Sequence, residues 1–290
     1  MFGAPNRTDY DLCFSVLGIP VRVHPMFWLV SAILGFGGGD PAHIMIWIGV
    51  MFVSILVHEL GHAFTMRYFG FNPSVALYAG GGLAMYQSVD SPWSSYGVNH
   101  PRRESPWTSI IISAAGPAAG FALATLVIIG VIAGGISDSL LGEPDATAEI
   151  ASAQTEQQPE SELGEQTPPG KAASDKPNEL LMVFIFYMLF INIFWGLVNL
   201  LPIYPLDGGQ ITREIVKMIN PYDGVRISLW ISLVTAAGVA ILGINITMFI
   251  TFMFGYFAFM NWQMLQATGG GFGGGGFGGG GGYGGGGRPW

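Results

Sequence analysis

Charged residues are scarce in this sequence: Asp, Glu, Lys and Arg make up 10% of its 290 residues, whereas hydrophobic residues make up 50%. Roughly a quarter of an average soluble domain is charged, so these few charges cannot cover the surface of a soluble protein. The composition therefore excludes an ordinary soluble domain. It predicts a polytopic membrane protein whose apolar surface faces the lipid bilayer.

Cysteine and clustered basic residues are lacking as well. Cys13 is the single cysteine, which excludes an intramolecular disulfide. No run of Lys and Arg forms a basic face, so we expect no nucleic-acid partner. The net charge of −8 comes from residues 137–179, which hold ten acidic residues against two lysines.

Two polar or low-complexity segments flank or interrupt the apolar sequence. Residues 137–179 are rich in Glu, Gln, Ser and Pro, a composition that predicts a disordered acidic loop outside the membrane. Residues 266–290 are rich in glycine and predict a flexible cytoplasmic tail. A partner-binding role for the tail, through its spaced aromatic residues, stays open.

Apolar segments long enough for membrane spans account for most of the remaining chain. Because backbone groups in lipid must be hydrogen-bonded within their own segment, and no series of alternating strands indicates a barrel, we expect helices. This gives an all-α fold of about six transmembrane helices with a small membrane-associated β element. The expected spans are 26–38, 44–66, 107–136, 180–201, 227–244 and 245–265.

The distribution of Lys and Arg predicts the orientation of these spans. Nine basic residues fall on one side of the six-helix arrangement, and the other two, Lys171 and Lys176, lie in the acidic loop. The positive-inside rule then puts both termini in the cytoplasm of a cell (inner) membrane protein. The expected organisation is an N-terminal arm with short strands (1–25), a six-helix core (26–265) and the tail (266–290).

A cluster of ionisable residues lies inside the second apolar segment, which reads His58-Glu59-Leu60-Gly61-His62. Such groups are costly at membrane depth unless they are paired, bound to a ligand or facing water. His58 and His62 are four residues apart and share one helix face, so both imidazoles can bind one metal ion. Glu59 follows the first histidine directly and can reach a water molecule beside the metal. The alternative is a pair of helix-packing histidines with Glu59 as their counter-ion.

Zinc is the metal that imidazole and carboxylate ligands favour in a hydrolytic site, and such a site needs a third protein ligand. Asp207 is the best candidate, because it follows an apolar run and two prolines on irregular backbone. Irregular backbone at membrane depth is tolerated only inside protein or around a cavity. We therefore expect one Zn²⁺ ion held by His58, His62 and Asp207.

These residues resemble the site-2 protease family of intramembrane zinc metalloproteases. The resemblance rests on His58-Glu59-Leu60-Gly61-His62, on Asn199, Pro202, Pro205, Asp207 and Gly208, and on Ala115-Gly116-Pro117 in the third span. It implies Glu59 as general base, the three expected metal ligands, and Asn199 as a donor to the oxyanion. An interhelical hydrogen bond is the alternative for Asn199. The chain resembles members without a PDZ or a cystathionine-synthase-type domain.

Residues 74–87 follow the motif-bearing helix and alternate small and large apolar residues around Gly80, Gly81 and Gly82. We interpret them as a re-entrant hairpin or loop whose edge binds an extended substrate, as the resemblance also implies. A simple hairpin on the membrane surface is the alternative.

The resulting expectation is an enzyme that hydrolyses a peptide bond within or near the transmembrane segment of a membrane protein substrate, in regulated intramembrane proteolysis. Its active site would lie near the cytoplasmic side of the bilayer. The alternatives are a membrane zinc transporter or metal-binding sensor, and a pseudoprotease that binds membrane helices. The sequence does not predict the substrate or the oligomeric state.

Overall fold

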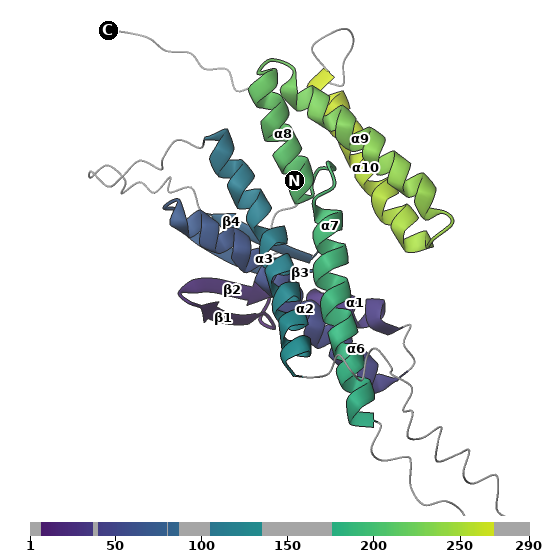
Figure 1. Ribbon diagram of the computed structural model, residues 1–290. Helices are drawn as coiled ribbons and strands as arrows, with labels where there is room; N and C mark the ends of the chain where they lie inside the picture. The colour runs from purple at the N-terminus through teal and green to yellow at the C-terminus, as the bar shows by residue number, and fades with distance from the viewer. Residues whose placement is uncertain (1–6, 37–39, 80, 87–104, 135–175, 270–290) are drawn as a thin grey trace, which may run out of the picture.

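The computed structural model describes residues 7–36, 40–79, 81–86, 105–134 and 176–269. It is mostly helical, with one small sheet (Figure 1). Within these residues, four helical segments are long and apolar enough to cross a membrane. They are Pro41–Tyr68 (α2), Pro106–Ala133 (α3), Glu179–Asn199 and Gly224–Gly243 (α9).

The other two expected spans are helical, but the count of six spans is not confirmed. The first, α1 (Pro25–Gly35), has 11 residues, about half of what is needed to cross a bilayer. The last, α10 (Met248–Gly269), has 22 residues, and Asn261, Gln263 and Gln266 lower the hydropathy of its second half. α10 also continues four residues beyond the predicted core boundary at 265.

The fourth span is not one regular helix. It consists of α6 (Lys176–Phe190), a π-helical turn, η2 (Ile191–Trp195), and α7 (Gly196–Asn199). The turn directs Asn192 towards α2, where its side-chain amide donates to Ser54 Oγ at 2.9 Å. The chain then leaves the helix and starts again as α8 (Asp207–Ile219).

The sheet contains four strands in the order β1-β2-β3-β4. Strands β1 (Leu12–Val16) and β2 (Ile19–Val23) form a hairpin in the N-terminal arm, where short strands were expected. Strands β3 (Pro73–Tyr78) and β4 (Gly81–Tyr86) form the hairpin expected within 74–87. β2 and β3 pair in parallel, which joins the two hairpins and leaves β1 and β4 as the edge strands.

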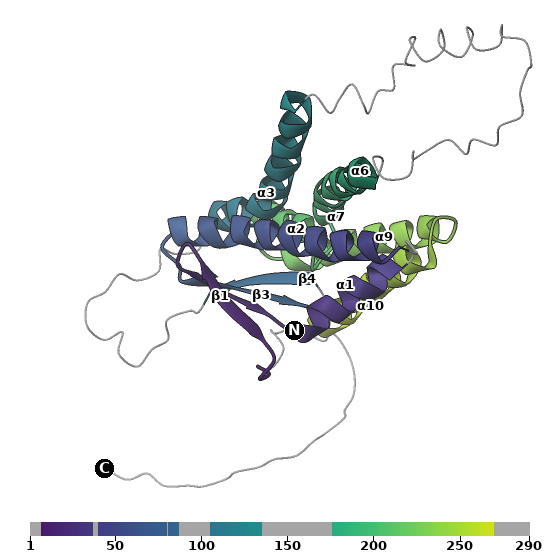
Figure 2. The same ribbon diagram turned by 90° about the horizontal axis from the view of Figure 1, so that it is seen from below.

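One apolar cluster fixes the sheet against the second helix. Val21, Val23 and Leu77 of the sheet pack with Ile55 and Leu60 of α2. These side chains are nearly or fully buried, and Figure 2 shows the sheet lying along α2. The packing surrounds the turn of α2 that holds His58 and Glu59, so the sheet covers the candidate site from one side.

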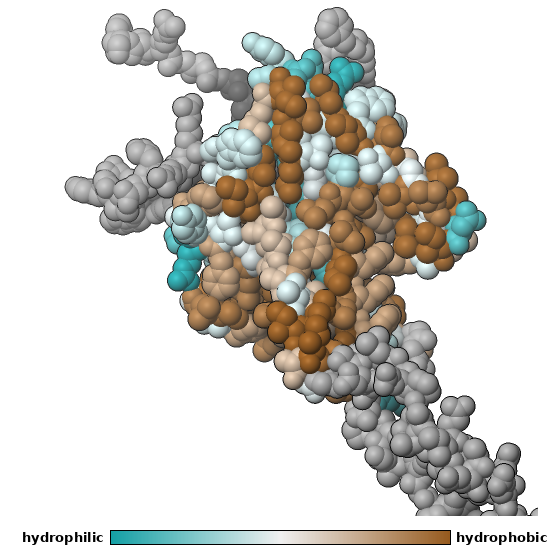
Figure 3. All heavy atoms as spheres, viewed as in Figure 1, coloured by the Kyte–Doolittle hydropathy of each residue, from teal (hydrophilic) through white to brown (hydrophobic). Residues whose placement is uncertain are grey.

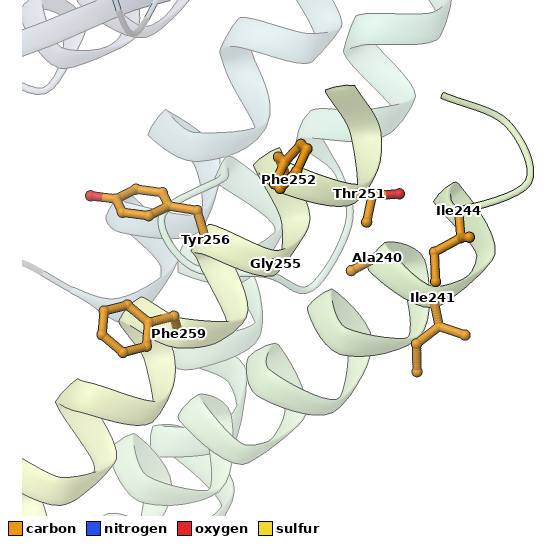
Figure 4. A pocket seen from close by; sticks show the side chains of 8 residues that line it. All are labelled: Ala240, Ile241, Ile244, Thr251, Phe252, Gly255, Tyr256 and Phe259. Atoms are coloured by element: carbon orange, nitrogen blue, oxygen red, sulfur yellow. The ribbon is translucent and has the colours of Figure 1, made fainter. Parts of the chain in front are cut away.

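Hydrophobic side chains cover much of the face shown in Figure 3, including the region of α6 and the hairpin of α9 and α10. This surface matches that of a protein surrounded by lipid. The hairpin also carries an apolar groove on its outer side (Figure 4). The groove is lined by Ala240, Ile241, Ile244, Thr251, Phe252, Gly255, Tyr256 and Phe259, and contains no residue of the candidate site.

Two predicted segments lie largely outside the described residues. Of the predicted acidic loop 137–179, only Lys176–Glu179 are described, and they are already helical as the first turn of α6. Of the predicted tail 266–290, residues 266–269 belong to α10. The remaining residues of both segments are not described.

Candidate metal centre

The centre of the site is one turn of α2. His58, Glu59 and His62 have 9%, 6% and 7% of their surfaces exposed, so the structure buries all three inside the protein. The two imidazoles lie on the same face, with Nε2 of His58 and Nε2 of His62 3.2 Å apart. The four-residue spacing therefore brings the two rings together, as expected for one helix face.

Asp207 reaches this face from the first turn of α8. Its Oδ2 lies 3.1 Å from His58 Nε2, and its Oδ1 lies 3.4 Å from His62 Nε2. A carboxylate in the first turn is favoured by the positive end of the helix dipole. The close approach of α8 to the preceding loop needs Gly208, since a Cβ there would overlap the Leu200 carbonyl.

The geometry and chemistry of these three groups fit a zinc ion. Their ligand atoms lie within 4.8 Å of one another, and three of the separations are 3.1, 3.2 and 3.4 Å. Ligand atoms about 2.0–2.1 Å from a tetrahedral zinc ion lie about 3.3–3.4 Å from one another. Two imidazoles and one carboxylate also form a set that leaves one coordination position open.

A hydrogen bond selects the tautomer of His62. Its Nδ1 lies 2.7 Å from the carbonyl oxygen of Ile112 on α3. A carbonyl only accepts, so Nδ1 carries the proton and, in the neutral ring, Nε2 has a free lone pair. Metal-binding histidines are typically oriented in this way by a partner on their second nitrogen.

Gly116 of α3 forms the wall opposite the two imidazoles. A Cβ at this position would lie 2.8 Å from His58 Nε2 and 2.5 Å from His62 Cε1, and it would overlap His62 Nε2. The space beside both candidate ligand atoms therefore exists only because residue 116 has no side chain. Sequence reasoning noted Gly116 as part of a motif but gave it no role.

Glu59 lies beside the two histidines on α2 and contacts strand β4. A Cβ at Gly82 would overlap Glu59 Cγ, so strand and carboxylate are in close contact. The backbone N–H of Ala84 donates a hydrogen bond to the carboxylate. Burial raises the pKa of the Tyr78 phenol on β3, and the nearby charge of Glu59 raises it further, so Tyr78 stays protonated at neutral pH.

The remaining predicted residues differ in what the structure says of them. Asn199 ends α7 and is 8% exposed, and none of the hydrogen bonds found among the described residues uses its side chain. Gly81 and Gly82 begin β4, and Gly81 has φ +110°. Gly80 lies outside the described residues.

Sequence reasoning missed two buried polar residues that contact the loop before Asp207 from other elements. Ser232 and Asn261 are buried polar residues on α9 and α10 whose side chains bond to the backbone of Tyr204. Asn261 was detectable as an amide within an apolar span. Its partner was not, because Tyr204 lies 57 residues earlier in the chain.

Known proteins give independent information on the chain. A relative from Synechocystis sp., whose name describes it as a candidate zinc metalloprotease, is 25% identical over 233 residues. The match covers 74% of this chain and 46% of the relative, so the chain spans about half of that protein's length. A solved structure titled Site-2 Protease from Methanocaldococcus jannaschii is 20% identical, with a TM-score of 0.49, and the match covers 88% of this chain and 95% of that one.

The family model described as Peptidase family M50 matches residues 46–242, which is more than half of the chain and includes all three candidate metal ligands. The chain therefore belongs to peptidase family M50, the site-2 protease family that its motifs resemble.

Proposed function

We propose that the chain is a zinc metalloendopeptidase of the site-2 protease type, which hydrolyses a peptide bond within or near the transmembrane segment of a membrane protein substrate. The observation that carries the proposal is the buried cluster of His58, His62 and Asp207, with Glu59 on the same turn of α2. Family membership and four apolar helices support it.

His58, His62 and Asp207 would hold one Zn²⁺ ion. A zinc ion held there supplies a Lewis acid, which polarises a carbonyl group and makes water a stronger acid. The three residues contribute one negative charge and two neutral imidazoles. The wall at Gly116 keeps the space beside the imidazoles open.

Glu59 would act as general base, by taking a proton from the attacking water and passing it to the leaving nitrogen. Two observations support this role. The carboxylate is buried, and it lies next to the first metal ligand without belonging to the ligand cluster. The Ala84 N–H also fixes its orientation.

Asn199 would donate a hydrogen bond to the oxygen on which negative charge develops. The absence of another described partner for its amide favours this role over an interhelical hydrogen bond. A well-placed donor of this type contributes about 3 kcal/mol to transition-state stabilisation.

A substrate helix has no free backbone groups, so it must unwind before hydrolysis. β4 is an edge strand, and its outer edge can pair with an extended peptide. Gly81 and Gly82 begin this strand, and Gly80 precedes it, so we assign substrate binding to these three glycines.

We infer from the distribution of basic residues a cell (inner) membrane location, with both termini in the cytoplasm and the site near the cytoplasmic side. The lipid bilayer and single-span membrane proteins are the expected partners. Regulated intramembrane proteolysis is the process in which such a reaction would serve.

The test is cleavage of a single-span test substrate in liposomes by wild type and Glu59→Gln, with zinc assayed in both. We expect wild type to cut and a chelator to stop it, whereas Glu59→Gln keeps zinc and loses at least about 100-fold in rate. Glu214→Gln is the matched control, because Glu214 pairs with Lys217 on α8 and should leave cleavage unchanged.

A different outcome of the same experiment would contradict the protease assignment. If wild type and Glu59→Gln both hold zinc and neither cuts any of several test helices, the protease assignment is wrong. Zinc flux across the liposome membrane in the same preparations would then identify a transporter.

A further inference from the structure

The backbone of Tyr204 is held from both sides by the C-terminal helical hairpin. Its N–H donates to Ser232 Oγ of α9 at 3.1 Å. Its carbonyl oxygen accepts from Asn261 Nδ2 of α10 at 2.7 Å. Tyr204 lies in the loop between α7 and α8, three residues before Asp207. We call Ser232 and Asn261 the Tyr204 clamp.

The two clamp residues are completely enclosed. Ser232 is 1% exposed and Asn261 is 0% exposed. Asn261 uses its amide group for Tyr204 and for the Phe257 carbonyl of its own helix, while its Oδ1 has no hydrogen-bond partner among the described residues. A buried acceptor without a partner costs about 1–3 kcal/mol. An apolar residue would avoid this cost, so helix packing alone does not explain an asparagine here.

The loop between α7 and α8 connects Tyr204 to the turn of Asp207 through close backbone contacts. Ile203 is fully buried, and its carbonyl accepts from the Leu206 N–H at 2.8 Å. A Cβ at Gly209 would overlap the backbone of Ile203 and Tyr204, so the loop lies directly against the first turn of α8. A shift of Tyr204 therefore shifts the turn that carries Asp207.

We propose that Ser232 and Asn261 are positioning residues for the third metal ligand, which act on Asp207 through the backbone of Tyr204. The proposal rests on the proposed function of the cluster as a zinc site. Asn261 lies beyond the family match, which ends at residue 242. The hairpin of α9 and α10 is then part of the metal centre's support as well as a membrane element.

Zinc affinity of the purified full chain, measured by competition with a chelator, tests this role. Outer partners of metal ligands typically contribute 10- to 100-fold to affinity, so we expect Ser232→Ala and Asn261→Leu each to weaken zinc binding by about that factor. The matched control is Ser228→Ala. Ser228 is 2% exposed on the same helix, and its hydroxyl donates only to Val225 within that helix.

Thermal unfolding of the zinc-free proteins separates positioning from simple structural support. A structural role alone would lower the unfolding temperature of the zinc-free variants and leave the zinc affinity of the folded fraction at the wild-type value, and this result would overturn the proposal. Ser232→Ala removes a single oxygen atom, so it provides the test even where Asn261→Leu does not fold.

Zinc binding by the wild-type protein distinguishes failure of the Tyr204 clamp from failure of the proposed metal centre. Zinc binding by wild type with unchanged affinity in Ser232→Ala and Asn261→Leu refutes the clamp and leaves the zinc site standing. Absence of zinc binding by folded wild type refutes the proposed metal centre and the clamp with it.

Discussion

Replacing Gly116 with alanine should remove zinc from the protein without weakening α3. The new Cβ would lie 2.5 Å from His62 Cε1 and 2.8 Å from His58 Nε2, where 3.4 Å is an ordinary contact. The His58 ring must therefore retreat by 0.6 Å, and the His62 ring by more than 0.9 Å because its Nε2 lies closer still. Metal–ligand distances tolerate only about 0.2 Å of error.

These displacements affect two ligands at once, so the loss should exceed that caused by an outer partner. We expect zinc affinity to fall by more than about 100-fold, the upper end for an outer partner, which corresponds to about 2.8 kcal/mol. The stability of the α3 helix should not fall, because alanine is about 1 kcal/mol more favourable than glycine in a helix interior.

The assay is zinc content and chelator competition on purified Gly116→Ala, with Gly130→Ala as control. Gly130 lies on the same helix, and a Cβ there would have no atom within 4 Å. Both variants gain the same helix propensity, so only the contact with the imidazoles differs. Zinc affinity of Gly116→Ala within about threefold of wild type, a difference of about 0.7 kcal/mol, would refute the reasoning.

Three further predictions concern other residues. Asn199→Ala should lower kcat about 100-fold or more at unchanged zinc content, and an equal loss of zinc would contradict the oxyanion role. Gly82→Ala should abolish cleavage while zinc stays bound, since its Cβ displaces Glu59; normal cleavage kinetics would disprove this contact. The hydrogen bond from the Thr8 hydroxyl is the main cause that lowers the pKa of Asp11 from 3.8 to about 2. The ionised carboxylate therefore stabilises the folded arm above about pH 4, and this contribution is lost as the pH falls towards 2. Carboxyl NMR titration should show the low pKa, and Thr8→Val should raise it.

The parts of the site that the sequence predicted are those encoded by local spacing. His58 and His62 share a helix face because four residues make about one helical turn, and any helix through that segment brings them together. Asp207 was predictable because prolines break the preceding helix and leave an acidic residue on irregular backbone. The two strand pairs were predictable from alternation and turns.

The parts that the sequence did not predict depend on contacts between distant segments. The role of Gly116 depends on the packing of α3 against His62, which lies 54 residues earlier in the chain. The hydrogen bond between Ser232 and Tyr204 was also not predictable, because the sequence around a serine in an apolar helix does not indicate its hydrogen-bond partner. The break in the fourth span was also missed, since a π-helical turn has no simple hydropathy pattern.

The parallel pairing of β2 with β3 has a consequence for the order in which the protein is made. The two strands are separated by α1 and α2, so the four-stranded sheet cannot form until both helices have left the ribosome. His58 and His62 emerge with α2, but Asp207 follows 145 residues after His62, and Asn261 later still. A nascent chain therefore carries two histidines and a carboxylate long before it has the complete candidate metal centre. Under the proposed function, hydrolysis needs Asp207 as well as the two histidines, so it cannot begin before Asp207 has been synthesised and has reached them.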